Sequence, residues 1–160
     1  MELPSGLVLK VLESWCICHF KDERHAPDAP PHFYIVIPLQ DSNLIISIIT
    51  SQVEKKKSYY SQVNIKALNG LVFFNKGEFS FLTRDVSVID CNQAELLSKA
   101  ELADRIKSEF KIIESQIPEK LKEKIQKAIL ESPLVRSHIK RALKNRKEAG
   151  IKFKSKDLTG

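Results

Sequence analysis

The sequence has few glycines and cysteines, five and three in 160 residues, and it has no long apolar run. The longest apolar segments, 33–39 and 44–49, are much shorter than the ~18 residues of a membrane-spanning helix. Three cysteines make no disulfide framework, which fits a reducing compartment. Residues 1–6 also lack the basic start and apolar stretch of a signal peptide. We therefore expect a cytoplasmic protein that does not enter a membrane.

Several motifs of common enzymes are missing. The sequence has no Gly-x-Ser-x-Gly elbow, no Walker loop and no dinucleotide fingerprint, so hydrolases, NTPases and Rossmann enzymes that use them are not expected. Cys16, Cys18, His19 and His25 are metal-ligand residue types, but they lack the Cys-x2-Cys spacing of zinc sites. Alternating cysteines are more typical of a packed strand face. We expect neither a metal nor a cofactor.

The positive charge is concentrated near the C-terminus. Residues 134–160 contain nine basic and two acidic residues, a net charge of +7, whereas the whole chain carries +6. The first 133 residues are therefore close to neutral and carry a cationic arm. The arm is interpreted in three ways: a solvated helix, a binding segment for nucleic-acid phosphates, or a contact for an acidic protein.

The first ninety residues have the pattern of β-strands. Short apolar and β-branched segments occur at 7–12, 33–38, 44–50, 63–65, 71–74, 79–82 and 86–89. Turn signals separate them, and the helices that a βαβ fold would need are missing. This predicts a small barrel or sandwich. The proline-rich loop 23–31 holds Arg24 and His25, which makes it a candidate functional loop.

The period changes to that of helices after residue 90. Apolar residues at steps of three and four predict a helix over about 93–115. Pro118 begins a second helix, and Ser132 with Pro133 begins a third that runs through Leu143 and carries the cations. The predicted fold is α+β, with a β domain over 1–91 and a helical extension with a basic tail over 92–160.

Polar side chains at strand ends form the candidate site: His32, Thr50 with Ser51 and Gln52, and Arg84. If the second and third strands are antiparallel, His32 and Thr50 lie at the same end of the sheet. An imidazole can exchange a proton with a ribose hydroxyl near neutral pH, and a guanidinium can stabilise the phosphorane charge. These residue types therefore suit phosphodiester chemistry without a metal.

Each of these residues also has a purely structural interpretation. A histidine at a strand start is commonly a surface residue, and Thr and Ser at a strand end usually close a turn. Arg84 and Asp85 also form a plausible local surface pair of little energetic weight.

In order along the chain, segments 6–12, 31–38, 44–52 and 84–90 resemble the strands of the PemK/MazF toxins. These toxins open with Gly and an apolar strand, continue with a basic-Pro-apolar strand, and carry Thr-Ser-Gln or a similar triplet after the third strand. They close with an Asp-x-Val-x-Ser-Ile-Asp-like segment. The resemblance covers about residues 5–91, and Ile49-Thr50-Ser51-Gln52 is its most specific part.

The resemblance implies a small SH3-like β-barrel, followed here by three C-terminal helices. It also implies a protein, often dimeric, that cuts single-stranded RNA without metal and is neutralised by an antitoxin. Thr50, with Ser51 beside it, matches the catalytic hydroxyl of the family, and His32 stands where the family has its catalytic Arg. Either His32 transfers a proton while Arg24 or Arg84 supplies the charge, or the barrel binds RNA without cutting it.

RNA contacts are expected from the basic loop, the residues after the third strand and the arm: Arg24, His25, Gln52, Lys55, Lys56, Lys57, Arg136, Lys140, Arg141 and Lys144. The leading hypothesis is an endoribonuclease of the mRNA interferase type. The alternative is a non-catalytic module that binds RNA or a protein. A third hypothesis, a DNA-binding regulator, treats the turn at Ser132 as part of a helix-turn-helix. Asn145 is the only amide of its recognition helix that could read bases.

Overall fold

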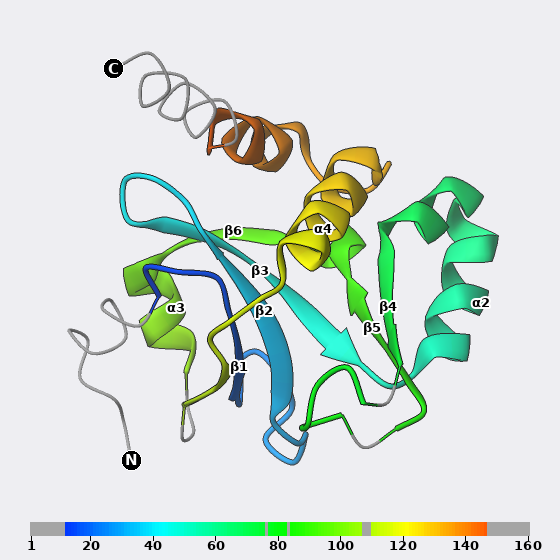
Figure 1. Cartoon of the computed structure of the whole chain (residues 1–160), viewed down its shortest axis with the longest axis horizontal. Coiled ribbons are helices and arrows are strands. Elements are labelled where there is room, and N and C mark those ends of the chain that lie inside the picture. The colour runs from blue at the N-terminus through cyan, green and yellow to red at the C-terminus, as the bar shows by residue number, and fades with distance from the viewer. Residues whose placement is uncertain (1–11, 76, 83, 107–109, 147–160) are drawn as a thin grey trace.

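The structure, a computed structural model, describes residues 12–75, 77–82, 84–106 and 110–146, and its architecture is α+β (Figure 1). The strands are β1 (Cys16–Phe20), β2 (His32–Pro38), β3 (Asn43–Thr50), β4 (Leu71–Asn75), β5 (Val86–Asp90), β6 (Glu95–Ser98) and β7 (Lys111–Glu114). The helices are α2 (Val53–Val63), α3 (Lys99–Arg105) and α4 (Glu119–Glu131), the 3-10 turns η1 (Ile65–Gly70) and η2 (Cys91–Gln93), and a helical segment over 137–146.

The strands form one seven-stranded antiparallel sheet in the order β4-β5-β3-β2-β1-β7, and β6 also pairs with β3. β3 is the centre of this sheet. One side of β3 pairs with β2 from Leu44 to Ile49. On its other side β3 pairs with two strands in turn. β6 pairs with β3 from Asn43 to Ile46, and β5 pairs with β3 only from Ile49. Residues 47 and 48 therefore lie at an opening in the sheet.

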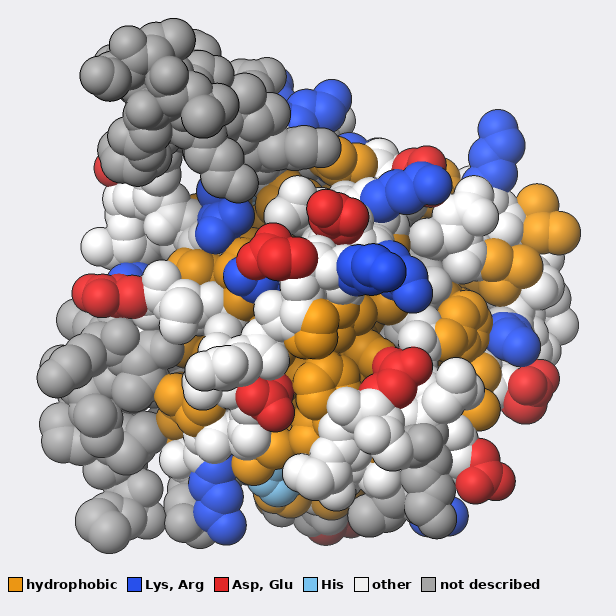
Figure 2. Space-filling view, viewed as in Figure 1, with side chains coloured by type: hydrophobic (Ala, Val, Ile, Leu, Met, Phe, Trp, Pro, Cys, Tyr) orange, Lys and Arg blue, Asp and Glu red, His pale blue; other side chains and the backbone are white. Residues whose placement is uncertain are grey.

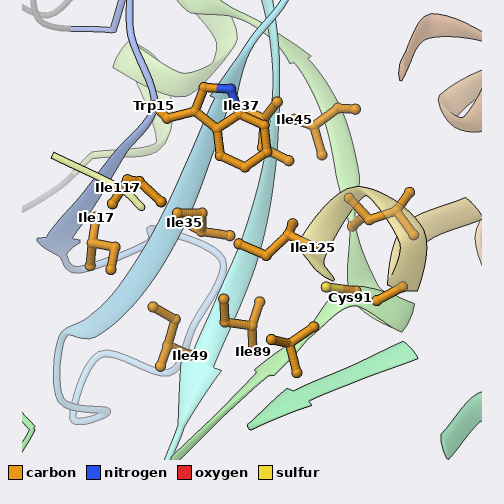
Figure 3. Packing of buried hydrophobic residues seen from close by; sticks show 14 of the residues in the cluster. Trp15, Ile17, Ile35, Ile37, Ile45, Ile49, Ile89, Cys91, Ile117 and Ile125 are labelled. Atoms are coloured by element: carbon orange, nitrogen blue, oxygen red, sulfur yellow. The ribbon is translucent and has the colours of Figure 1, made fainter. Parts of the chain in front are cut away.

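Successive side chains along β2 and β3 point to opposite faces of the sheet, so they belong to two buried clusters, one on each face. Ile35, Ile37 and Ile45 point to the first face, where Ile125 of α4 packs against them (Figure 3). The opposite face holds Tyr34, Val36, Leu44 and Ile46 together with Leu102, Ile106 and Phe110. The predicted apolar stripe of α4 is thus confirmed, since Ile125 and Ile129 are fully buried.

The helix predicted over 93–115 is wrong. This stretch holds β6, α3 and β7, with residues 107–109 outside the described residues. A capping box begins α3, because Ser98 Oγ accepts a hydrogen bond from Glu101 N and the Glu101 carboxylate accepts one from Ser98 N. The capping box stabilises a helix start directly after Ser98. β6 pairs instead with the free half of β3, and β7 covers the free edge of β1.

Other elements also differ from the sequence predictions. Residues 63–65 end α2 and begin η1, and residues 79–82 form turns rather than a strand. The last helix begins at 137 instead of 133, although Ser132 Oγ still accepts hydrogen bonds from the backbone N–H groups of Leu134 and Val135. Most of the strand predicted at 7–12, and the cations from Lys147 onward, lie outside the described residues.

The three cysteines are free and buried. Burial raises the pKa of the Cys16 thiol to about 12, and it also raises the pKa values of Cys18 and Cys91. Cys16 and Cys18 contribute to a packed strand face, as the sequence predicted. Of the helices in the described part of the chain, none has the length and apolar character to cross a bilayer.

Candidate functional site

The candidate site lies at one end of the sheet, where β2 begins and β3 ends. Phe33 pairs with Ile49 in an antiparallel ladder, so His32 and Thr50 are the next residues along the two strands. Residues that stand directly opposite each other on two paired strands have their side chains on the same face of the sheet. β5 starts at this same end, because Thr50 pairs with Val88, and Arg84 comes two residues before β5. The fold thus brings His32, Thr50 and Arg84 to a common end.

A second histidine joins His32 from the loop between β1 and β2. The rings of His25 and His32 meet edge to face, with their centroids 5.1 Å apart. The Nδ1 atom of each ring is buried without a hydrogen-bond partner among the described residues. Burial lowers the pKa of His32 below its ordinary value of 6.5, and the nearby His25, His19 and Lys21 lower it further. Neutral pH therefore favours a neutral His32, which can accept a proton.

Hydrogen bonds hold the loop that carries His25, both within the loop and to α3. Lys21 Nζ donates hydrogen bonds to the carbonyl oxygens of Ala26 (2.6 Å) and Pro27 (3.0 Å), and it also donates to that of Ala29. Glu23 N donates to the carbonyl oxygen of Arg105 at 2.9 Å, which ties the loop to the end of α3. These bonds hold the loop, and with it His25, in place beside β2.

Arg24 belongs to a network of two arginines and two carboxylates. Its guanidinium lies 2.8 Å from Glu95 Oε1 and 3.2 Å from Asp22 Oδ2, and Arg105 Nη1 lies 2.9 Å from Glu95 Oε2. Burial alone would raise the pKa values of Glu95 and Asp22, but hydrogen bonds from the arginines outweigh it and hold both below their ordinary values. The positive charge of Arg24 is therefore balanced by the carboxylates of Asp22 and Glu95.

Arg84 differs from Arg24 in its surroundings. Arg84 is exposed, and no ion pair joins it to another described residue. Of the two arginines that the sequence offered as the source of positive charge, Arg84 is thus the one whose charge is not already paired.

Thr50, Ser51 and Gln52 form the link from β3 into α2. Thr50 Oγ1 accepts a hydrogen bond from Gln52 N at 3.1 Å, which closes the turn, while the Thr50 hydroxyl proton remains available for donation. Ser51 and Gln52 are exposed, and Gln52 occupies the N-cap position of α2 without a side-chain capping bond. Thr50 therefore has a structural role and still offers a donor.

The three lysines at 55–57 lie on α2 and have different neighbours. Lys55 is exposed. Lys56 Nζ lies 2.9 Å from Oδ2 of the fully buried Asp90, which also accepts a hydrogen bond of 2.7 Å from Tyr60. Lys57 Nζ lies 5.3 Å from the ring centroid of Phe73, over its face. Lys56 thus stabilises the contact between α2 and β5, whereas Lys55 and Lys57 face outward.

The basic residues of the arm also include both exposed side chains and one that makes a hydrogen bond within the protein. Arg136, Arg141 and Lys144 are exposed, while Lys140 Nζ donates a hydrogen bond to the Ser132 carbonyl oxygen at 2.6 Å. The segment is attached through apolar side chains, since Val135, Ile139 and Leu143 are buried in the cluster shared with α4. It is a packed part of the protein as far as residue 146.

The sequence analysis missed a cavity of about 660 Å³ that adjoins the candidate site through His25. Its lining includes Tyr34, Ser47, Glu95 and Arg105, none of which was singled out from the sequence. No local signal could have identified them, because the cavity forms where a loop, β3, β6, α3 and residues 134–139 meet.

Within the described ranges, no group of three or more His, Cys, Asp and Glu side chains is placed to hold a metal ion. The groups gathered at the candidate site are two imidazoles, a hydroxyl and a guanidinium.

No protein-family model matches the chain, and a search of curated proteins finds no match either.

Proposed function

We propose that this chain is a PemK/MazF-like, toxin-antitoxin-type protein that cuts single-stranded RNA without a metal, and that its sheet is a variant of the SH3-like barrel. The observation that carries the proposal is the placement of His32, with its lowered pKa, beside His25 and at the same end of the sheet as Thr50 and Arg84. A proton acceptor, a second imidazole, a hydroxyl and an unpaired cation are the groups that RNA transesterification requires.

The proposed reaction begins at the ribose 2′-hydroxyl. His32 accepts the 2′-OH proton while the 2′-oxygen forms a bond to phosphorus. The bond from phosphorus to the 5′-oxygen then breaks, and the leaving 5′-oxygen takes a proton from a protonated His25. Arg84 stabilises the negative charge on the phosphorane, and Thr50 donates a hydrogen bond to a phosphate oxygen. The products are a 2′,3′-cyclic phosphate and a free 5′-hydroxyl.

The proposal extends to the partners that the resemblance implies. They are an antitoxin protein and a second copy of the chain, in the cytoplasm. Hydrophobic side chains that are large and exposed are present on and after α2, namely Tyr59, Val63 and Ile65. On the face shown in Figure 2, hydrophobic side chains are visible near the middle and toward α2, with charged side chains around them. A protein partner could cover such surface.

Cleavage of an end-labelled single-stranded RNA tests the catalytic proposal. We expect fragments that end in 2′,3′-cyclic phosphate, with a yield that EDTA does not change. A deoxyribose at the scissile position should block the cut, because it removes the nucleophile. RNA that binds but stays intact over a wide range of sequences and pH would contradict cleavage.

One observation favours a second candidate, a non-catalytic RNA-binding module. Lys57 lies over the ring of Phe73, which is 42% exposed. Lys124 and Lys127 line a groove of about 430 Å³ that also includes Phe73. Exposed aromatic rings beside lysines bind single-stranded nucleic acids by stacking and by phosphate contacts. Binding without cleavage in the assay above would support this candidate.

The cationic arm can be tested without removing the buried residues that attach it. Replacing Arg141 and Lys144 with glutamine removes two exposed charges. If both contact RNA phosphates, the slope of log K against log salt concentration should decrease by about 1.4, at about 0.7 per contact. Fluorescence anisotropy of a labelled RNA at several salt concentrations measures this slope.

The matched control replaces Lys66 and Lys120 with glutamine. Both lysines are exposed and lie outside the arm, so the control removes the same charge from another surface. Equal slopes for the two double variants would assign the arm to solubility or to a protein partner.

A further inference from the structure

The cavity beside His25 is built around the opening in the sheet. β6 leaves β3 after Ile46, and β5 joins it only at Ile49, so residues 47 and 48 have no strand partner on that side. In an antiparallel ladder, successive residues direct their N–H and C=O groups to opposite sides. One of these two residues therefore directs a donor and an acceptor away from β2, toward the cavity that both residues line.

Two buried hydroxyl groups also lack partners at this cavity. Tyr34 is 4% exposed and Ser47 is 1% exposed, and neither hydroxyl has a hydrogen-bond partner among the residues that the structure describes. Both residues line the cavity. Burying an unpaired hydroxyl is costly, so buried polar groups nearly always have partners. Tyr34 pairs with Ile48 and shares a face of the sheet with it, whereas Ser47 pairs with Ile35 and points to the other face. A ligand against Ile46 and Ile48 would therefore supply the missing hydrogen bond of the Tyr34 hydroxyl.

The rest of the lining is mixed, with apolar side chains beside polar ones such as Asn92, Gln93 and Glu101. Ile46 and Ile48 of β3 and Leu96 of β6 line the cavity together with the two hydroxyl residues. A volume of about 660 Å³ lies within the range of pockets for small organic ligands. A heterocyclic base, which has apolar faces and hydrogen-bonding edges, matches this combination of apolar side chains and polar groups.

Some of the arginines that line the cavity are already paired with a carboxylate of the described residues, and one is not. Arg24 and Arg105 line it, but both are paired with Glu95. Arg136 also lines it and is exposed, and the described residues include no carboxylate paired with it. Arg136 is therefore the cation that can bind an anionic group.

The segment that carries Arg136 is held firmly over the sheet. Ser132 Oγ donates a hydrogen bond to Asn92 Oδ1 at 2.6 Å, and Arg146 Nε donates one to the Pro38 carbonyl oxygen at 2.6 Å. The buried side chains of Val135 and Ile139 lie between these two anchors. Packed elements thus hold Arg136 at the cavity.

From this arrangement we propose that the cavity binds one nucleoside monophosphate unit. The base lies against Ile46 and Ile48 and exchanges hydrogen bonds with the Tyr34 hydroxyl and the backbone at the sheet opening, and Arg136 binds the phosphate. This site does not depend on RNA cleavage. The nucleotide is either a free molecule or one residue of a bound RNA, and both present the same chemistry to the cavity.

Isothermal titration of the full chain with AMP, GMP, CMP and UMP tests the proposal, with inorganic phosphate and the matching nucleosides as comparison probes. We expect at least one nucleotide to bind with a Kd below about 1 mM, and more tightly than phosphate or its nucleoside. Tyr34→Phe and Arg136→Gln should each weaken that binding by about 3- to 10-fold, as the loss of one hydrogen bond does. Lys120→Gln removes an exposed cation of α4 that does not line the cavity, and it should leave the binding unchanged.

A stability measurement separates ligand binding from a structural role of Tyr34. Without nucleotide, Tyr34→Phe should leave the unfolding midpoint in urea unchanged or raise it, because it removes a buried hydroxyl that lacks a partner. A lower midpoint would show that the hydroxyl has a partner within the protein and would overturn its assignment to a ligand.

Competition identifies the source of the nucleotide. If a short single-stranded RNA displaces the bound nucleotide, the cavity holds a residue of RNA, and if it does not, the cavity holds a free nucleotide. The proposal fails if none of the four nucleotides binds at millimolar concentration. It also fails if the Tyr34 and Arg136 variants bind as well as the unaltered chain.

Discussion

Replacing His32 with alanine is expected to lower the rate of RNA cleavage by about 100- to 10,000-fold, the usual effect of removing a positioned proton-transfer group. The expected loss is in kcat, with RNA affinity largely kept, because His32 acts on the proton of the reacting hydroxyl. Single-turnover cleavage of a labelled RNA at saturating protein measures this step separately from binding.

The pH profile gives an independent check on the same residue. His32 must be neutral to accept a proton, and burial with neighbouring cations lowers its pKa below 6.5. The rate should therefore rise with pH along an acidic limb whose midpoint lies below 6.5. A midpoint above 6.5 would contradict the assigned base.

Conservative variants distinguish proton transfer from positioning. His32→Asn keeps a hydrogen-bonding side chain that cannot titrate, so it should be as slow as His32→Ala and should lose the acidic limb. Thr50→Val removes one hydrogen bond to phosphate, and a loss of about 2- to 12-fold is expected. If His32→Asn cuts RNA at the original rate, His32 only positions other groups.

The central strands could be predicted because most residues along them are buried, which gives a nearly continuous apolar run in the sequence. β2 and β3 are buried on both faces and therefore appear as nearly continuous apolar runs bounded by turn residues. α4 could be predicted from Leu121, Ile125 and Ile129, which share one helix face against the sheet. In these elements the local pattern and the tertiary packing agree.

The helix predicted over 93–115 shows where the sequence pattern misleads. Leu102, Ile106 and Phe110 follow one another at steps of four and are all buried in one cluster, but only Leu102 lies in a helix, and Ile106 forms a bridge with Asp22. Spacing of three to four residues also arises when a strand, a short helix and an extended segment successively bury side chains in one cluster. Only the cap at Ser98 marks the true helix start in the sequence.

The candidate site was accessible to sequence reasoning only in part. His32 and Thr50 stand next to recognisable strands, so antiparallel pairing was enough to bring them to one end. His25 meets His32 through the path of an eleven-residue loop, and the cavity depends on where β6 and β5 leave β3 unpaired. Such features are set by long-range pairing and have no local pattern.

The second large effect is expected in the core beneath α3. Phe110 is 7% exposed, its ring centroid lies 5.9 Å from that of Phe20, and it shares a buried cluster with Leu102 and Ile106. Phe110→Ala should therefore lower the free energy of unfolding by about 3 to 5 kcal/mol, through lost burial and the cavity left behind. Urea denaturation should show a lower midpoint with an unchanged slope.

Ile65→Ala provides the matched control, because Ile65 is 68% exposed and should change the stability by no more than about 0.5 kcal/mol. Phe110 directly precedes β7, which pairs with β1, and Ile106 bridges Asp22 at the base of the loop that carries His25. The truncation should consequently loosen this loop and slow cleavage as well. A stability loss below about 1 kcal/mol would mean that the segment from α3 to β7 is only loosely attached to the sheet.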